Sequence, residues 1–435
     1  DRRKEQDRAF TLSVRNNYSL GSSRAGSPRW YQKGSLVMDM LRDVLGVEEF
    51  RAVIKHYFEK NYLDYVESTD FTSAVFDITG RDISWFFDEW LYKGGEPHYK
   101  VRTVESSDYE MKRSTFFHVE QTHKQNEFVG LFKMPIVFEV HYADGSFDRV
   151  KQFIEKQYTV VKIPNPKYLD IEYTLFDPGR RVMKTVEFNK PFDELSAQAI
   201  KAENMIDRYD ALVALGERRR WEKIKLFKQI MLNEKFYLLK QEVVSQTIAA
   251  RTKALQEDNS NYVPGDLVFG NEYSEYQKGK KNYEDIMRMA FNDSDPRVRL
   301  EAAEKVGRIE LSLKSDVEKM LTDISYPNIS AALELLCHSF PGKVNSYLER
   351  TKNLLGWRGL NIRMAWLKIA VELGKDEYYI MLEDYASLSF EFETRINAIN
   401  ILKAQNYLTE ASAYHILEAS TSRNRKVGNT AVAAL

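Results

Sequence analysis

A unit of about 32 residues recurs in the second half of the chain, and this period restricts the fold more than any other feature. The copies share small and aliphatic residues along one helix face, usually beside a basic residue. When the copies are aligned, one equivalent position is occupied by Arg208, Lys240, Arg299, Ala331, Arg363, Arg395 and Lys426. Subtraction gives successive steps of 32, 59, 32, 32, 32 and 31 residues. Paired helices with this period are typical of an α-solenoid, which is predicted for residues 193–435.

Residues 30–96 show helical spacing of apolar side chains. The first stripe ends at Gly46 and consists of Leu36, Val37, Met40, Leu41, Val44 and Leu45. In "RDISWFFDEWLYKGGEP", Asp82 is the predicted N-cap and Trp90 belongs to the predicted core face. Glycines and Pro97 then end the helical segment, because glycine closes a helix and proline cannot continue it.

After Pro97 the apolar period shortens to two, the period of a strand. "PIVFEVHYADGSF" is rich in β-branched and aromatic residues, with Asp144-Gly145 as a hairpin turn. A later run, "YLDIEYTLFDPGRRVMKTVEF", alternates and then turns at Asp177-Pro178-Gly179. Several short strands joined by turns predict an antiparallel β-sandwich over residues 98–192.

Composition excludes several classes of protein. The 435 residues are too many for one core, and they carry 63 basic against 64 acidic side chains. The near-zero balance gives no global field for nucleic acid or an anionic membrane. The lone Cys337 excludes an internal disulfide and a cysteine-based zinc site. No apolar run reaches the roughly 18–20 residues needed to cross a bilayer.

No complete catalytic motif is present. The chain lacks His-Glu-x-x-His, a phosphate-binding glycine loop, a dinucleotide fingerprint and a Gly-x-Ser-x-Gly elbow. His118 and His123 are five apart, so on one strand they would lie on opposite faces and would be solvated rather than bind one metal. The basic run at residues 218–228 is predicted to be a solvated helix face, with nucleic-acid binding as the less favoured alternative.

The order of these elements resembles the C-terminal part of the aminopeptidase-N-like zinc peptidases, the gluzincin aminopeptidase family. The motifs that carry the resemblance are "YQKGSLVMDMLRDVLG", "EEFRAVIKHYF", "GRDISWFFDEW" and "GGEP". It implies a multidomain α fold with a β-sandwich insert. Its parts would be a helical remnant of the catalytic domain (1–97), the sandwich (98–192) and a HEAT/armadillo-like solenoid (193–435).

By this resemblance Tyr31 matches the family's catalytic tyrosine, whereas spacing alone indicates a half-buried structural tyrosine. A phenol held at a helix start can donate a hydrogen bond to the oxyanion that forms when a peptide carbonyl is attacked. A preorganised donor of this kind contributes about 3–4 kcal/mol in the transition state. Gly34 is expected to allow a close backbone approach, and Lys33 to belong to the framework.

The family's zinc ligands, its catalytic glutamate and its substrate-amine motif are expected before the Tyr-x-Lys-Gly motif, farther than the 30 residues that precede Tyr31 here. The chain starts with "DRRKEQDRAF", without Met or an apolar signal core, so it is expected to be a processed product or a piece of a longer protein. Alone it is expected to bind no catalytic zinc and to hydrolyse no peptide.

Two functions remain open at this point. In the first, the chain is the C-terminal portion of a zinc aminopeptidase that acts on peptides with free N-termini, and its partner is the missing N-terminal half. In the second, it is a non-catalytic scaffold of the same family that binds proteins through its solenoid. Retention of Tyr31 favours the enzyme. A branch of the family that opens lipid epoxides is a third possibility, for which no residue here argues.

Overall fold

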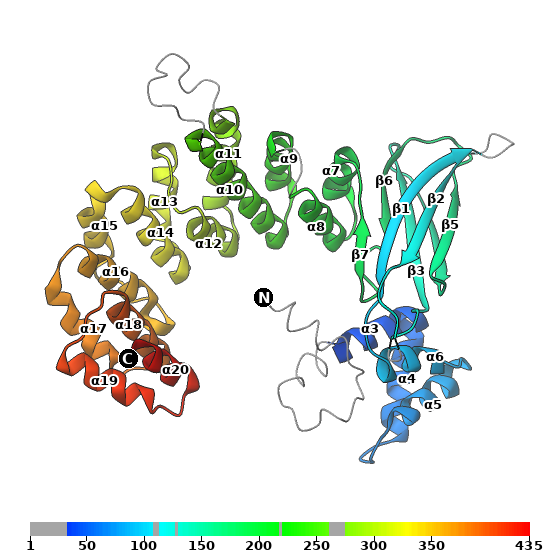
Figure 1. The fold of residues 1–435 in the computed structure, drawn as a ribbon, viewed down its shortest axis with the longest axis horizontal. Coiled ribbons are helices and arrows are strands. Elements are labelled where there is room, and N and C mark those ends of the chain that lie inside the picture. The colour runs from blue at the N-terminus through cyan, green and yellow to red at the C-terminus, as the bar shows by residue number, and fades with distance from the viewer. Residues whose placement is uncertain (1–32, 108–112, 127–128, 217–219, 261–274) are drawn as a thin grey trace. The chain divides into compact units, whose positions relative to one another are not determined.

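The computed structural model describes residues 33–107, 113–126, 129–216, 220–260 and 275–435. The chain divides after Leu215 into two compact units, unit 1 and unit 2. Unit 1 holds a small helical part, two β-sheets and two further helices, and unit 2 is helical (Figure 1). The described part contains helices together with mainly antiparallel sheets, as the periodicity predicted.

The helical part of unit 1 contains α3 (Gly34–Leu45), α4 (Val47–Lys60), α5 (Ser68–Thr79), α6 (Ser84–Phe87) and the π-helix η3 (Asp88–Tyr92). Gly46 separates α3 from α4 at a φ of 93°, and Gly80 ends α5 at a φ of 66°. Both angles favour glycine, because a Cβ would crowd the backbone there. The N-cap of α6 is Ile83, so the prediction of Asp82 is wrong by one residue. The Asp82 Oδ1 accepts a hydrogen bond from the backbone N–H of Ser84 at 2.8 Å.

In the part of unit 1 that the structure describes, seven strands follow in two sheets. They are β1 (His98–Ser107), β2 (Arg113–Gln121), β3 (Met134–Tyr142), β4 (Phe147–Ile154), β5 (Tyr158–Pro164), β6 (Ile171–Phe176) and β7 (Thr185–Phe188). One sheet has the order β5-β2-β1-β7 and the other β4-β3-β6. Phe117 of β2 meets Phe138 of β3 with ring centroids 5.1 Å apart, so apolar faces of the two sheets pack on each other.

The sheets differ from the prediction at one edge. β7 pairs with β1 in parallel, from His98 opposite Thr185 to Val101 opposite Phe188. All the other pairs are antiparallel, and β3 carries an irregularity between His141 and Tyr142 where it pairs with β6. The predicted antiparallel sandwich is therefore mixed at this edge. α7 (Phe192–Lys201) and α8 (Met205–Ala214) complete unit 1, and α7 packs on β6.

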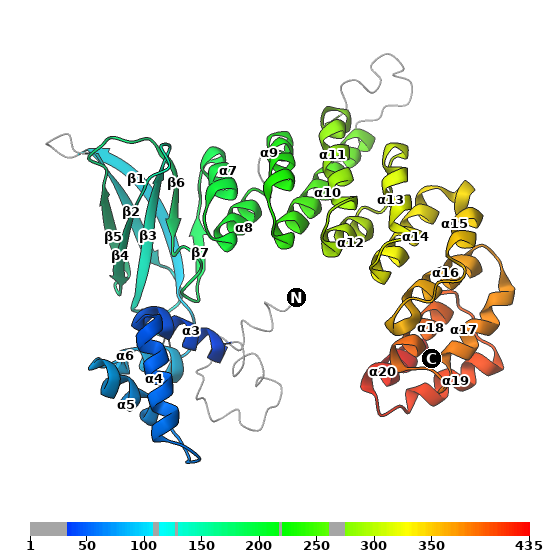
Figure 2. The same cartoon turned by 180° about the vertical axis from the view of Figure 1, so that it is seen from behind.

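Unit 2 begins with α9 (Arg220–Asn233), α10 (Tyr237–Ser260), α11 (Glu275–Phe291) and α12 (Pro296–Lys305). Helices α13 to α20 follow, with the bounds Lys314–Met320, Tyr326–Ser339, Val344–Thr351, Asn361–Glu372, Tyr379–Ala386, Phe392–Ala404, Glu410–Ser420 and Arg425–Ala434. Each even-numbered helix from α10 to α20 contacts the next even-numbered helix, so these helices form one layer of unit 2. The odd-numbered helices form a second layer beside it (Figures 1 and 2). None of the helices in the described ranges is long and apolar enough to cross a membrane.

Candidate functional site

The predicted catalytic residue, Tyr31, lies outside the described residues, which begin at Lys33. The structure does describe the helix that follows it. Lys33 is fully buried immediately before α3. A Cβ built on Gly34 meets no described atom within 4 Å, so the close approach expected at this glycine is not found among the described residues.

Helix α3 is anchored by its apolar face. Four of its side chains are buried, and these are Val37, Met40, Leu41 and Leu45. The Met40 sulfur also accepts a hydrogen bond from the backbone N–H of Met183 at 3.3 Å, beside the sheets. The helix that would carry Tyr31 at its start is therefore packed against both the helical part and the β-structure of unit 1.

Arg81 closes the far end of α3. Its guanidinium donates to the carbonyl oxygens of Leu45 at 3.0 Å and Val44 at 3.4 Å, and it pairs with Glu49 of α4. Carbonyl groups in the last turn of a helix lack partners within the helix, so a cation there is favourable. Arg81 thus joins α3, α4 and the segment after α5.

The prediction that Trp90 belongs to the core is confirmed, although the residue lies in the π-helix η3 rather than in an α-helix. Its side chain is 0% exposed and belongs to the main core cluster of unit 1. The indole N–H donates to the Met134 sulfur at 3.2 Å, and the ring centroid lies 5.0 Å from that of Phe132. This residue fixes the helical part to the sheet that contains β3.

Next to Trp90, Glu89 is a buried acid that the sequence did not single out. One carboxylate oxygen accepts from the backbone of Lys133 at 2.8 Å, and the other is buried without a hydrogen-bond partner in the described part of the chain. Burial raises the pKa of Glu89 to about 8. Burial and the charge of Glu89 also raise the pKa of Tyr99, whose buried hydroxyl has no described partner either. Glu89 lines a cavity of about 170 Å³.

The two histidines considered as metal ligands are not brought together. His118 is on β2 beside Tyr158, whereas His123 lies beyond the end of that strand. The prediction that both are solvated is wrong for His123, which is 8% exposed and contacts the Gly130 carbonyl oxygen at 2.8 Å. In the described ranges, no three His, Cys, Asp or Glu side chains are placed to hold a metal. These residues therefore do not fit a zinc centre.

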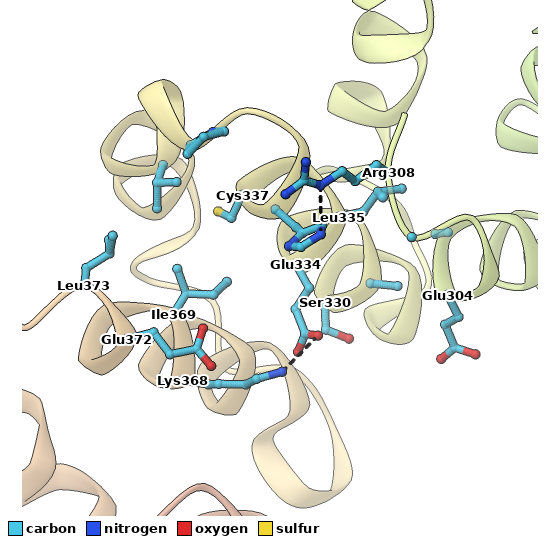
Figure 3. A pocket seen from close by; sticks show the side chains of 16 residues that line it. Glu304, Arg308, Ser330, Glu334, Leu335, Cys337, Lys368, Ile369, Glu372 and Leu373 are labelled. Carbon is cyan, nitrogen blue, oxygen red and sulfur yellow. Dashed lines mark hydrogen bonds and ion pairs between the residues drawn. The ribbon is translucent and has the colours of Figure 1, made fainter. Parts of the chain in front are cut away.

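A cavity of about 730 Å³ lies wholly within unit 2 (Figure 3). Charged residues at its edge come from three neighbouring helices or their ends. Arg308 contacts His338 at 3.1 Å and Lys368 pairs with Glu334 at 3.4 Å, while Leu335 and Ile369 contribute apolar surface. The described lining of this cavity therefore carries charges of both signs beside apolar surface.

Sequence reasoning missed Glu89 and Lys190, the two groups whose burial changes their pKa most clearly among the described carboxylates and amines. A weak signal existed for Glu89, because it stands between Phe87 and Trp90 in an apolar run. No local pattern marked Lys190, whose burial depends on packing between β6, β7 and α7.

Comparison with known proteins finds a family match for one segment of the chain. Residues 22–90 match the Peptidase family M1 domain. Aminopeptidase N of Lactococcus lactis is 38% identical over 77 residues, which are 18% of this chain and 9% of that protein. A probable aminopeptidase 1 of Sulfurisphaera tokodaii is 27% identical over 112 residues, or 26% of this chain and 13% of that protein. The matched segments are thus small parts of these relatives.

The structural likeness extends over much more of the chain. Legionella pneumophila aminopeptidase A, solved in complex with aspartic acid, matches with a TM-score of 0.50 at 12% identity. The match covers 98% of this chain and 59% of that one, and at this identity it shows the fold alone. In sequence, residues 22–90 are thus similar to the aminopeptidase-N-like gluzincin metallopeptidases of the M1 family, and over the rest of the chain the likeness is one of fold.

Proposed function

We propose that this chain is the C-terminal portion of a zinc aminopeptidase that removes N-terminal residues from peptides. The match of residues 22–90 to the Peptidase family M1 domain carries the proposal, because that segment includes the Tyr-Gln-Lys-Gly motif of Tyr31. The relatives named above are aminopeptidases, which supports the same reaction class. Peptides with free N-termini would be the substrates.

In this proposal Tyr31 supplies a hydrogen bond to the carbonyl oxygen of the scissile peptide as negative charge develops there. The buried face of α3 and the contacts of Arg81 support this role, because a donor that directly precedes a well-anchored helix would need little reorganisation during the reaction. Since the described residues do not fit a zinc centre, zinc and its ligands would belong to the remaining part of the catalytic domain, which is also the proposed partner of this chain.

The three-part division into residues 1–97, 98–192 and 193–435 remains a proposal, as does the HEAT/armadillo-like character of the last part. The repeated basic residue supports the repeat. In three copies the arginine side chain donates to a backbone carbonyl oxygen that precedes its own helix. The pairs are Arg208 with Ala202, Arg299 with Asp293 and Arg395 with Ala386. Helices α7 and α8, which the division assigns to the solenoid, lie in unit 1.

The test of the catalytic role is Tyr31→Phe in the full-length enzyme that contains this chain. We expect kcat to fall about 100- to 1,000-fold with little change in KM, because only the transition state uses the hydroxyl. Turnover of an aminoacyl-chromophore at several substrate concentrations measures both constants.

Tyr65→Phe is the matched control, since Tyr65 is fully exposed after α4 and should leave both constants unchanged. A rise in KM alone in Tyr31→Phe would show that Tyr31 is a packing residue. Chelator-sensitive turnover by the present chain alone, supplied with zinc, would contradict the proposal that its active site is incomplete.

The alternative, a non-catalytic scaffold of the same family, is less favoured, because every relative named above is an aminopeptidase. Zinc analysis of the full-length protein separates the two functions. A full-length protein that binds no zinc and turns over no aminoacyl substrate would support the scaffold.

A further inference from the structure

A cavity of about 410 Å³ lies within unit 1 between the sheet edge and helices α7 and α8. Two lysines line it and both are nearly inaccessible, with side chains 5% exposed for Lys184 and 6% exposed for Lys190. The two differ in what their nitrogens contact, and this difference separates their chemistry.

The nitrogen of Lys184 is paired with a carboxylate. It donates to Asp177, whose side chain is 1% exposed, and to the carbonyl oxygen of Val182 at 3.3 Å. The Lys184 nitrogen is therefore occupied by an ion pair within the protein.

The nitrogen of Lys190 contacts neutral acceptors instead. It donates to the Thr174 carbonyl oxygen and to the side-chain oxygen of Gln198 at 2.7 Å. The orientation of the Gln198 amide is fixed, because its nitrogen donates to the carbonyl oxygen of Asp207 at 2.7 Å. Two N–H groups satisfy these two acceptors, so a neutral amine fits the site and keeps its lone pair.

The carboxylates around Lys190 offset only part of the cost of burying its charged form. Glu194 of α7 lies 3.7 Å from the nitrogen, but the same oxygen accepts from the backbone and hydroxyl of Thr174 at 2.9 and 2.6 Å. Asp207 and Asp210 of α8 attract the ammonium from farther away. Arg180, Lys184 and Asp177 line the same cavity. Burial outweighs the attraction and lowers the pKa of Lys190 to about 8.

We propose that Lys190 is an acylation site, at which its side-chain amine accepts an acyl group from a small acyl phosphate that enters this cavity. The lone pair on Nζ attacks the carbonyl carbon and forms the C–N bond. The bond from that carbon to the phosphate oxygen breaks, and phosphate leaves with the electron pair. The nitrogen then loses one proton to phosphate or water, which leaves a neutral amide without any oxidant or reductant.

Acylation would alter the junction between β6 and α7. The amide has one N–H, so it can satisfy either Thr174 or Gln198 but not both. It also abolishes the cation–π contact that the protonated form of the amine makes with the Phe188 ring, whose centre lies 4.4 Å from the nitrogen. The modification would therefore loosen the contact of α7 with the sheet.

The test is acetylation of the intact chain with acetyl phosphate between pH 6 and 10, followed by digestion and mass spectrometry of each lysine. At pH 7.5 we expect Lys190 to be acetylated about tenfold faster than Lys184 and faster than exposed lysines, whose amines lose their proton only near pH 10.4. The rate at Lys190 should level off above pH 8, and denaturant should abolish its preference.

Gln198→Glu sharpens the test by placing a carboxylate where the neutral oxygen now accepts from Lys190. We expect at least a tenfold loss of acetylation at Lys190, whereas Gln157→Glu on the exposed surface should change nothing. Lys190→Arg should remove the signal from its peptide and leave the acetylation of Lys184 unchanged. Equal rates at Lys184 and Lys190 in the folded chain, or no effect of Gln198→Glu, would overturn the proposal.

Discussion

Single buried ionisable side chains affect the properties of unit 1. One of them, Glu89, makes the stability of this unit depend on pH. Its pKa is about 8 in the folded chain because of burial, against an ordinary value of 4.5. Between these values only the folded state holds the proton. The stabilisation is therefore complete below about pH 4.5 and is lost as the pH rises towards 8.

We expect unit 1 to lose about 3 kcal/mol of stability between pH 5 and pH 8, and Glu89→Gln to remove most of this loss. Calorimetric or urea unfolding at the two pH values measures the difference. Glu120→Gln, an exposed change on β2, should keep the pH dependence of the unaltered chain. A pH dependence unchanged in Glu89→Gln would show that this carboxyl is not protonated in the folded chain.

At single positions, the sequence predicted residues whose environment is set by their near neighbours. Trp90 lies on a regular apolar stripe, so its burial followed from the period. His123 is buried because the chain leaves β2 at Gln121 and folds back onto Phe132. Such a return is a tertiary feature that residue spacing does not encode. Tyr31 was identified by resemblance, and its hydroxyl lies outside the described residues.

At the scale of elements, two of the repeated arginines pair with a carboxylate of a later segment, Arg299 with Asp323 and Arg395 with Glu418. Arg299 at the start of α12 forms a two-pronged pair with Asp323, with both distances 2.7 Å and side chains 13% and 6% exposed. Arg297, two residues earlier, forms a similar pair with Asp295 but is 56% exposed. The two residues provide a matched comparison on one helix.

Arg299→Ala should destabilise unit 2 by about 3 kcal/mol, because it leaves a buried carboxylate without its cation. Arg297→Ala should cost less than about 1 kcal/mol, since an exposed pair contributes little. Chemical denaturation of the two variants at one pH provides the comparison. Equal losses would mean that the repeated arginine adds nothing beyond surface charge.

The local sequence pattern predicted some features of the strands and helices and not others. The Asp144-Gly145 turn was predictable, and Gly145 has the expected φ of 86°. The parallel direction of β7 was not, because a four-residue strand carries no mark of its neighbour. The π-helix η3 was missed for a similar reason, since its extra residue per turn alters the apolar period too little over five residues.

At the scale of the whole molecule, each unit has buried residues of its own. Trp90 belongs to the core of unit 1, and Leu333 of α14 is 0% exposed in unit 2. We expect two calorimetric transitions. Trp90→Ala should lower the free energy of unfolding of unit 1 by about 3–5 kcal/mol, because it leaves a cavity in the core. Leu333→Ala should lower that of unit 2 by about 2–5 kcal/mol for the same reason. If either substitution shifted both transitions equally, the units would unfold as one.

The helical period near 32 residues was the most reliable long-range feature of the sequence. It predicted a helical second part, and unit 2 is helical throughout its described elements. The long step of 59 residues was read as an excursion, and part of that stretch, residues 261–274, lies outside the described residues. Sequence periodicity finds repeated helices, but it does not show where one compact unit ends, because that depends on which helices pack on the sheet.

Cys337 is the chain's single sulfhydryl. It is buried on α14 beside the large cavity of unit 2, and burial raises its pKa to about 12. A disulfide reagent added to the native chain would therefore react slowly, because the thiolate that it needs is scarce while Cys337 stays buried. The rate of that reaction would then report how often local opening exposes this side chain.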